Sequence, residues 1–272
     1  MKIFISADME GITGISHDDQ TFGTTSEYMQ GRKWMTSDVN AAIEGALKAG
    51  ATDIVVKDAH GNARNILLDE LKKEATLIAG WDVMESMVQG IDDTYDALAL
   101  IGYHSMVGTE NGMISHTMTG CIKQLSINNR PIGESELSAL TAGHYGVPLV
   151  FVAGDQTVVS ELTGFVGEIP HVITKYGMGR DTGKLAHPEL TRKAITEEVH
   201  KALSDLSKFK PFQVELPLTI SVKLSKPSMA DLVSLVPDVH KNGIDEVIYK
   251  AQDVLSMLRM FRVVLGLAWS LK

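Results

Sequence analysis

The sequence predicts an α/β fold, with a Rossmann-like, doubly wound and mainly parallel sheet followed by a second, smaller two-layer α/β domain. Through residue 155, continuous apolar runs alternate with amphipathic segments, which is typical of strands buried on both faces of a parallel sheet. Beyond residue 185, a period-two alternation appears, which is typical of a sheet with one covered face. We therefore expect a catalytic domain over residues 1–184 and a smaller domain over 185–272.

The first domain is expected to begin with a strand at 2–6. Three further runs, at 52–58, 96–103 and 147–155, have the same continuous apolar character. Between the first two strands, apolar residues recur at helical spacing from Val39 to Leu47, with Gly50 as a stop signal. A strand, helix and strand in this order indicate a βαβ unit with a right-handed crossover.

The second domain is expected to follow an αβαβα order. Its segments are a helix over 187–209, a strand over 211–225, a helix over 227–237, a strand over 246–251 and a helix from Gln252. This order predicts one sheet with helices on one face.

Composition limits the class of protein. The net charge is −9, which argues against a nucleic-acid partner, because phosphate binding requires a basic surface. No apolar run approaches the ~20 residues of a membrane span, so no membrane partner is expected. The N-terminus does not resemble a secretory leader, and Cys121 is the single cysteine, so a cytoplasmic protein is expected.

Side chains that can bind metals follow each predicted strand of the first domain. In strand order they are Asp8 and Glu10, Asp58 and His60, His104, and Asp155. Ligands of open parallel sheets bind at the carboxyl ends of the strands, so these side chains are expected at one edge. Individual residues of this set could equally be helix caps or turn residues, and both interpretations remain open from the residues alone.

Asp8 and Glu10 stand two residues apart, so an extended backbone would direct both carboxylates to one side. Two carboxylates held together repel each other unless a cation lies between them. His60 and His104 offer the nitrogen ligands that zinc favours, and Glu134 precedes a helix expected to start near residue 135.

A glycine-rich stretch, KYGMGRDTGKL at 175–185, does not have the spacing of a phosphate-binding loop. Its Lys175 and Arg180 could meet a substrate carboxylate, or they could be ordinary charges of a solvated loop.

Five motifs together resemble the zinc-dependent D-aminopeptidases associated with bacterial dipeptide-transport operons. They are SADMEG (6–11), KDAHGN (57–62), GYHS (102–105), ISHTM (114–118) and NRPIGE (129–134), and they stand in the family's order. The resemblance extends from residue 1 to about 160 and thins beyond it. It implies a Rossmann-like layer with a smaller α/β domain, in agreement with the fold predicted from the periodicity.

The resemblance also implies two zinc ions per subunit. Asp8 would bridge both ions, Glu10 and His104 would bind one, and His60 and Glu134 would bind the other. Two dications, three carboxylates and a bridging hydroxide would sum to a charge near zero. Each histidine needs an acceptor for its second ring nitrogen, for which Asp58 and Asp155 are candidates.

The family treats the residue at His116 as catalytic, usually as a nucleophile. Because a metal-bridging hydroxide is itself a strong nucleophile, we interpret His116 as a proton shuttle or an oxyanion donor. Without the resemblance, a lone histidine between Ser115 and Thr117 would be an ordinary loop residue.

The leading hypothesis is a dinuclear zinc aminopeptidase that removes the N-terminal residue from short peptides with a metal-bridged hydroxide. The D-preference comes only from the resemblance, as does a homo-oligomeric ring of ten subunits. Two alternatives remain: a dinuclear-metal hydrolase of another amide or a phosphoester, and a metal- or peptide-binding protein without turnover.

Overall fold

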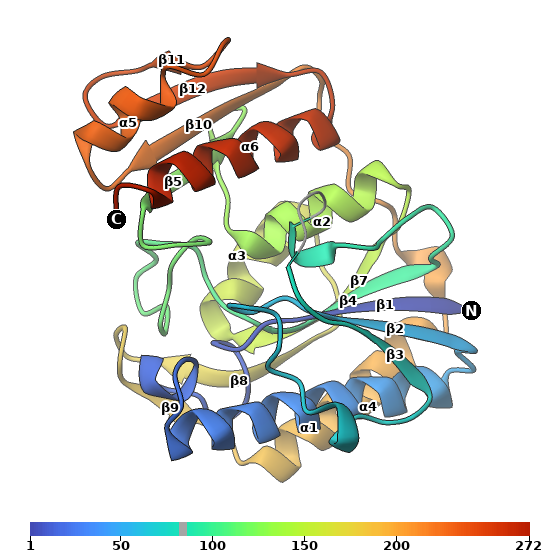
Figure 1. The fold of residues 1–272 in the computed structure, drawn as a ribbon. Helices are drawn as coiled ribbons and strands as arrows, with labels where there is room; N and C mark the ends of the chain where they lie inside the picture. The colour runs from blue at the N-terminus through green and yellow to red at the C-terminus, as the bar shows by residue number, and fades with distance from the viewer. Residues whose placement is uncertain (82–85) are drawn as a thin grey trace.

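The computed structural model describes residues 1–81 and 86–272, and within them it forms two sheets (Figure 1). The larger sheet has seven strands in the order β3-β2-β1-β4-β7-β8-β9, and only β9 pairs antiparallel. Its strands are β1 (Lys2–Ala7), β2 (Asp53–Asp58), β3 (Ala75–Ile78), β4 (Ala97–Tyr103), β7 (Leu149–Asp155), β8 (His171–Gly177) and β9 (Gly183–Leu185). The reversal of strand order on either side of β1 and β4 confirms the predicted doubly wound topology.

Two helices cover each face of this sheet (Figure 1). On one face lie α1 (Ser26–Lys48) and α4 (Pro188–Leu203), and on the other lie α2 (Glu134–His144) and α3 (Gln156–Val166). Every residue of β4 and β7 is buried, because these central strands are covered on both sides. This explains why their sequences are continuous apolar runs.

The smaller sheet has five strands in the order β11-β12-β10-β5-β6. Its strands are β5 (Ile122–Ile127), β6 (Arg130–Pro131), β10 (Leu218–Leu224), β11 (His240–Lys241) and β12 (Glu246–Ala251). One face is covered by α5 (Pro227–Val233) and α6 (Val254–Trp269), with a core of its own. The burial of β10 alternates along the strand, as expected for a sheet covered on one face.

The predicted boundary between residues 184 and 185 does not coincide with the division between the two sheets. The hairpin β5–β6 joins the smaller sheet, although it lies far upstream in the chain. Conversely, α4 lies on the larger sheet, where Ile195 and Val199 pack in the same core as α1. Each sheet with the helices that cover it is called a layer below, the larger layer or the smaller layer. The chain therefore passes from one layer to the other three times rather than once.

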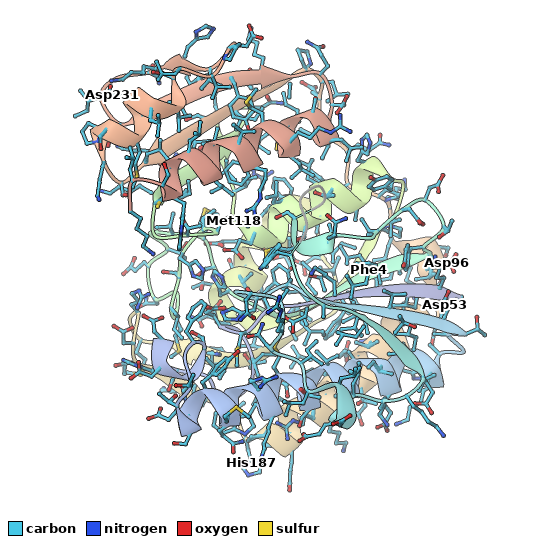
Figure 2. All side chains as sticks on the ribbon, in the orientation of Figure 1. Phe4, Asp53, Asp96, Met118, His187 and Asp231 are labelled. Carbon is cyan, nitrogen blue, oxygen red and sulfur yellow. The ribbon has the colours of Figure 1, made fainter. Side chains whose placement is uncertain are left out.

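The two layers meet along α6, which packs beside α2 (Figure 1). Met118 lies between the layers (Figure 2) and packs against the cores of both. Four 3-10 turns, at Asp18–Gln20, Leu68–Glu70, Ser86–Val88 and Leu206–Lys208, complete the described elements. Within the described residues, no helix is both long enough and apolar enough to cross a membrane.

Candidate functional site

The structure brings the carboxyl ends of β1, β2 and β4 together, because these strands are neighbours in the larger sheet. Asp8 follows β1, His60 follows β2 and His104 follows β4. Glu134 reaches the same place from the first turn of α2. Asp8, Glu10 and His104 each offer a ligand atom within 4.8 Å of the others, and so do His104, His116 and Glu134.

Asp8 and Glu10 converge through a turn rather than through an extended strand, so the predicted reason for their convergence was wrong. β1 ends at Ala7, and the backbone then folds over the end of β4. The N–H of Asp8 donates to the carbonyl of Ile101 at 2.8 Å, and that of Gly11 donates to the carbonyl of Gly102 at 2.8 Å. A Cβ on Gly11 would lie 1.9 Å from the carbonyl oxygen of Tyr103, so only glycine fits there.

Hydrogen bonds fix both candidate histidine ligands with Nε2 directed into the site. Nδ1 of His104 lies 2.8 Å from the carbonyl oxygen of Ser105, which can only accept, so Nδ1 carries the proton. Nδ1 of His60 lies 3.3 Å from Oδ1 of Asn65. The Asn65 amide donates to Asp58 Oδ1 and to the carbonyl of His60, so its oxygen is the acceptor for the ring. In the neutral histidines, Nε2 is therefore free to bind a metal.

The two carboxylates expected to be histidine partners have other roles. Asp58 does not contact the ring of His60 but positions its acceptor, because Asp58 accepts from both the backbone N–H and the side-chain amide of Asn65. Asp155 accepts from the N–H of Val158 and caps α3, and it also accepts from the N–H of Met113. The helix-cap interpretation is therefore correct for Asp155, and the acceptor for His60 is Asn65, which the sequence did not single out.

Each Nε2 faces a carboxylate across the site. His60 Nε2 lies 3.1 Å from Glu10 Oε1, and His104 Nε2 lies 3.4 Å from Asp8 Oδ2 and 3.6 Å from Glu134 Oε1. Burial alone would lower the pKa of His60, but Glu10, Asp8 and Asn65 together outweigh burial and raise that pKa to about 9. Burial, together with the neighbouring Glu10, raises the pKa of Asp8 well above its usual value.

His116 lies at the open side of this cluster. Its ring stacks on that of His104, with centroids 4.2 Å apart, and its Nε2 lies 3.7 Å from Glu134 Oε1. Its Nδ1 lies 3.1 Å from the carbonyl oxygen of Ile114, so Nδ1 carries the proton here too. The side chain is 27% exposed, whereas those of His60 and His104 are almost fully buried. His116 can thus meet a ligand that approaches from solvent.

The site fits a cation. Three carboxylates are almost completely buried, and three of the ligand atoms have no hydrogen-bond partner among the described residues: Asp8 Oδ2, Glu10 Oε2 and His104 Nε2. Unpartnered buried acceptors are costly, and a metal ion would satisfy them. A set of imidazole nitrogens and carboxylate oxygens matches the ligand preference of zinc.

Comparison with known proteins agrees with this chemistry. The model of a D-aminopeptidase family matches residues 1–263. The chain belongs to this D-aminopeptidase family. A D-aminopeptidase of Bacillus subtilis (strain 168) is 32% identical over 269 residues, which cover 98% of each chain. The family assignment makes the chain a peptidase.

The solved structure of a Zn-dependent D-aminopeptidase, DppA from Bacillus subtilis, described as a self-compartmentalizing protease, is also similar. It superposes with a TM-score of 0.95 at 32% identity, covering 99% of this chain and 98% of the other. This similarity confirms the predicted fold class. The zinc dependence of the relative, together with the two clusters of ligand atoms, supports zinc in this family member.

Lys175 and Arg180 of the glycine-rich stretch differ in their surroundings. Arg180 is half-exposed and pairs with Asp181 at 2.8 Å and with Asp18 at 3.5 Å. Lys175 lies in β8 and is fully buried, so the solvated-loop interpretation was wrong for it. Its Nζ donates to the carbonyls of Glu10 and Ile15, which holds the turn that carries the first two carboxylates.

Proposed function

We propose that this chain is a dinuclear zinc aminopeptidase that removes the N-terminal residue, a D-amino acid, from short peptides. The observation that carries the proposal is the group of buried carboxylates and histidines at one sheet edge, with unpartnered ligand atoms and the more exposed His116 beside them. The D-aminopeptidase relatives support the choice of bond and of stereochemistry.

Five residues would hold the two ions. Asp8 would bind both, with Glu10 and His104 on one ion and His60 and Glu134 on the other. Asp8, Glu10 and His104 form a compact group of ligand atoms, which supports the first set. The contacts of His60 with Glu10, and of His104 with Glu134, support placing both sets in one cluster. Zinc held there supplies Lewis-acid polarisation of a carbonyl and activation of water at neutral pH.

His116 would move a proton during the reaction. Because its Nδ1 donates to the carbonyl of Ile114, its Nε2 is the atom that faces Glu134 and the open side of the site. An imidazole in this position can accept a proton and deliver it to the leaving amine. The ring of His104 stacks on that of His116 and so limits the orientations of the imidazole.

The assembly and the location are part of the same proposal. The Zn-dependent relative is a self-compartmentalizing protease. We extend this to a homo-oligomeric ring of ten subunits here, in which the smaller layer takes part in assembly and in closing the site. A single cysteine, which cannot form an intrachain disulfide, is consistent with a cytoplasmic protein.

The test is to remove metal with a chelator, restore zinc, and measure hydrolysis together with bound zinc. The substrates are D-Ala-D-Ala, L-Ala-L-Ala, N-acetyl-D-Ala-D-Ala and a phosphodiester. We expect two zinc ions per subunit and cleavage of the free D-dipeptide only. Cleavage of the acetylated peptide at an equal rate would refute the aminopeptidase, and equal rates on both enantiomers would refute the D-preference. Zinc binding without hydrolysis would favour the binding protein.

The role of His116 is tested separately with His116→Ala. We expect zinc binding to persist while kcat falls by a factor of about 10²–10⁴, the usual contribution of a general acid or base. His144→Ala is the matched control, because His144 is exposed at the end of α2. An unchanged kcat in His116→Ala would remove this residue from the mechanism.

A further inference from the structure

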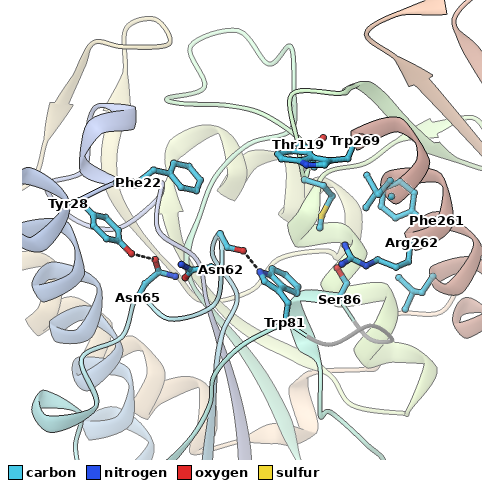
Figure 3. A pocket seen from close by; sticks show the side chains of 16 residues that line it. Phe22, Tyr28, Asn62, Asn65, Trp81, Ser86, Thr119, Phe261, Arg262 and Trp269 are labelled. Atoms are coloured by element: carbon cyan, nitrogen blue, oxygen red, sulfur yellow. Dashed lines mark hydrogen bonds between the residues drawn. The ribbon is translucent and has the colours of Figure 1, made fainter. Parts of the chain in front are cut away.

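A cavity of about 720 Å³ lies between the two layers of the molecule (Figure 3). One wall consists of loops at the carboxyl edge of the larger sheet and the start of α1, and the other is α6 of the smaller layer. Aromatic side chains line both walls: Phe22, Tyr28 and Trp81 on one side, Phe261 and Trp269 on the other. Its volume lies within the range of pockets that enclose small ligands, which is about 300–1,000 Å³.

The cavity borders the candidate metal site through lining residues that contact two of the candidate ligands. The ring of Phe22, on the cavity wall, lies 4.6 Å from the ring of His60. Asn65, which also lines the cavity, fixes the same histidine through Nδ1. Met118 lines the cavity and donates its N–H to Glu134 Oε1 at 2.5 Å. The cavity therefore lies next to the metal site, although the candidate ligands themselves do not line it.

Arg262 is the single charged residue among the described residues that line the cavity. It projects from α6 toward Ser86 and Trp81 (Figure 3). Within residues 1–81 and 86–272, its guanidinium makes neither a hydrogen bond nor an ion pair. A guanidinium beside an apolar wall, with its donors free, is suited to a planar anion such as a carboxylate.

We propose that this cavity receives the part of the substrate that follows the scissile bond, and that Arg262 pairs with the substrate's free C-terminal carboxylate. The inference rests on the proposed aminopeptidase function. The aromatic walls accept the side chain of the second residue. Selectivity for very short peptides would thus arise within one subunit.

The experiment compares D-Ala-D-Ala with its C-terminal amide in the wild-type enzyme and in three variants. Arg262→Met removes the charge and keeps an unbranched side chain, while Arg262→Lys keeps the charge without the planar fork. Arg259→Met is the matched control, because Arg259 is exposed on the same helix and does not line the cavity. Bound zinc is measured in every variant.

We expect Arg262→Met to lower kcat/KM on the free acid by a factor of about 10–100, as for loss of a hydrogen bond to a charged group, and to change the amide much less. Arg262→Lys should restore part of the loss, and Arg259→Met should behave as wild type. Equal losses on acid and amide, or no loss on the acid, would overturn this inference while leaving the proposed function intact. Failure of the proposed function has a different signature, namely wild-type cleavage of the N-acetylated dipeptide at an undiminished rate.

Discussion

The buried Lys175 allows a quantitative test of how the chain holds its first two carboxylates in place. Its ammonium is fully buried and donates to the carbonyl oxygens of Glu10 and Ile15, the latter at 2.6 Å. Burial lowers the pKa of this ammonium to about 8, because enclosure away from water disfavours the charged form. Lys175→Met keeps an unbranched apolar stem and removes the charged donor.

The expected loss of stability in Lys175→Met follows from the two carbonyl oxygens that lose their hydrogen-bond donor. Each buried carbonyl left without a partner costs about 1–3 kcal/mol, so Lys175→Met is expected to lower the free energy of unfolding by about 2–6 kcal/mol. The charge no longer needs to be buried, which places the result in the lower half of that range. Because one acceptor belongs to Glu10 itself, we also expect zinc affinity to fall about 10–100-fold, as for loss of a group that orients a metal ligand.

Lys57 is the matched control, since it is also a buried lysine of the same sheet. Its Nζ donates to a single carbonyl, that of Gly80, at 2.7 Å. Lys57→Met should therefore cost about 1–3 kcal/mol and leave zinc affinity close to that of the wild type. Urea unfolding of the metal-free proteins gives the stabilities, and competition with a zinc indicator gives the affinities. If Lys175→Met bound zinc as tightly as Lys57→Met, the positioning role of Lys175 would be refuted.

Two further predictions concern the same region. In the metal-free protein the raised pKa of His60, about 9 against 6.5 for the unfolded chain, gives a stabilisation that is complete below pH 6.5 and is lost as the pH rises through 9. Zinc added at neutral pH must displace that proton, so calorimetry in buffers of different ionisation enthalpy should show proton release. If zinc bound without releasing a proton, the assignment of His60 as a ligand would be contradicted. Gly11→Ala should lower stability by about 1–3 kcal/mol and reduce bound zinc, because its Cβ would overlap the carbonyl of Tyr103. Gly120→Ala, whose Cβ would meet open space, should change stability by less than about 0.5 kcal/mol in thermal unfolding, and equal effects of the two changes would refute the steric argument.

The larger sheet could be predicted from the sequence because its central strands are buried on both faces. The four predicted runs correspond to β1, β2, β4 and β7. The short β3 escaped prediction because none of its four residues is fully buried and the exposed Thr76 interrupts the apolar run. The hairpin β5–β6 joins a sheet whose other strands begin only at Leu218, far downstream, and local periodicity carries no information on such long-range pairing.

The beginning of α1 shows a similar limit. Apolar spacing predicted the half of this helix from Val39 onward, which packs in the core. The helix starts at Ser26, capped by the hydroxyl of Thr25, and most residues of its first two turns are exposed. An exposed helical segment has no apolar stripe that could reveal it.

For the site, the rule that ligands gather at carboxyl strand ends correctly predicts that Asp8, His60 and His104 lie at one edge of the sheet. The rule does not predict which acceptor each ring nitrogen meets, because that depends on rotamers and on loops after the strands. Asn65 accepts from His60 because the loop after β2 folds back onto this histidine. No motif in the sequence indicates that the loop folds in this way.

The fold places metal binding and the proposed recognition of the substrate's C-terminus on different elements. All five candidate metal ligands project from the larger sheet's edge and from α2, where Lys175 and the close packing at Gly11 hold the backbone rigidly. Arg262, which is proposed to bind the substrate's C-terminal carboxylate, projects from α6 in the smaller layer. Substitutions along α6 should therefore change which peptides are cleaved, whereas substitutions at the sheet edge should decide whether metal is held at all. An α6 variant that loses zinc while its unfolding free energy stays unchanged would show that the two layers are coupled more tightly than this division allows.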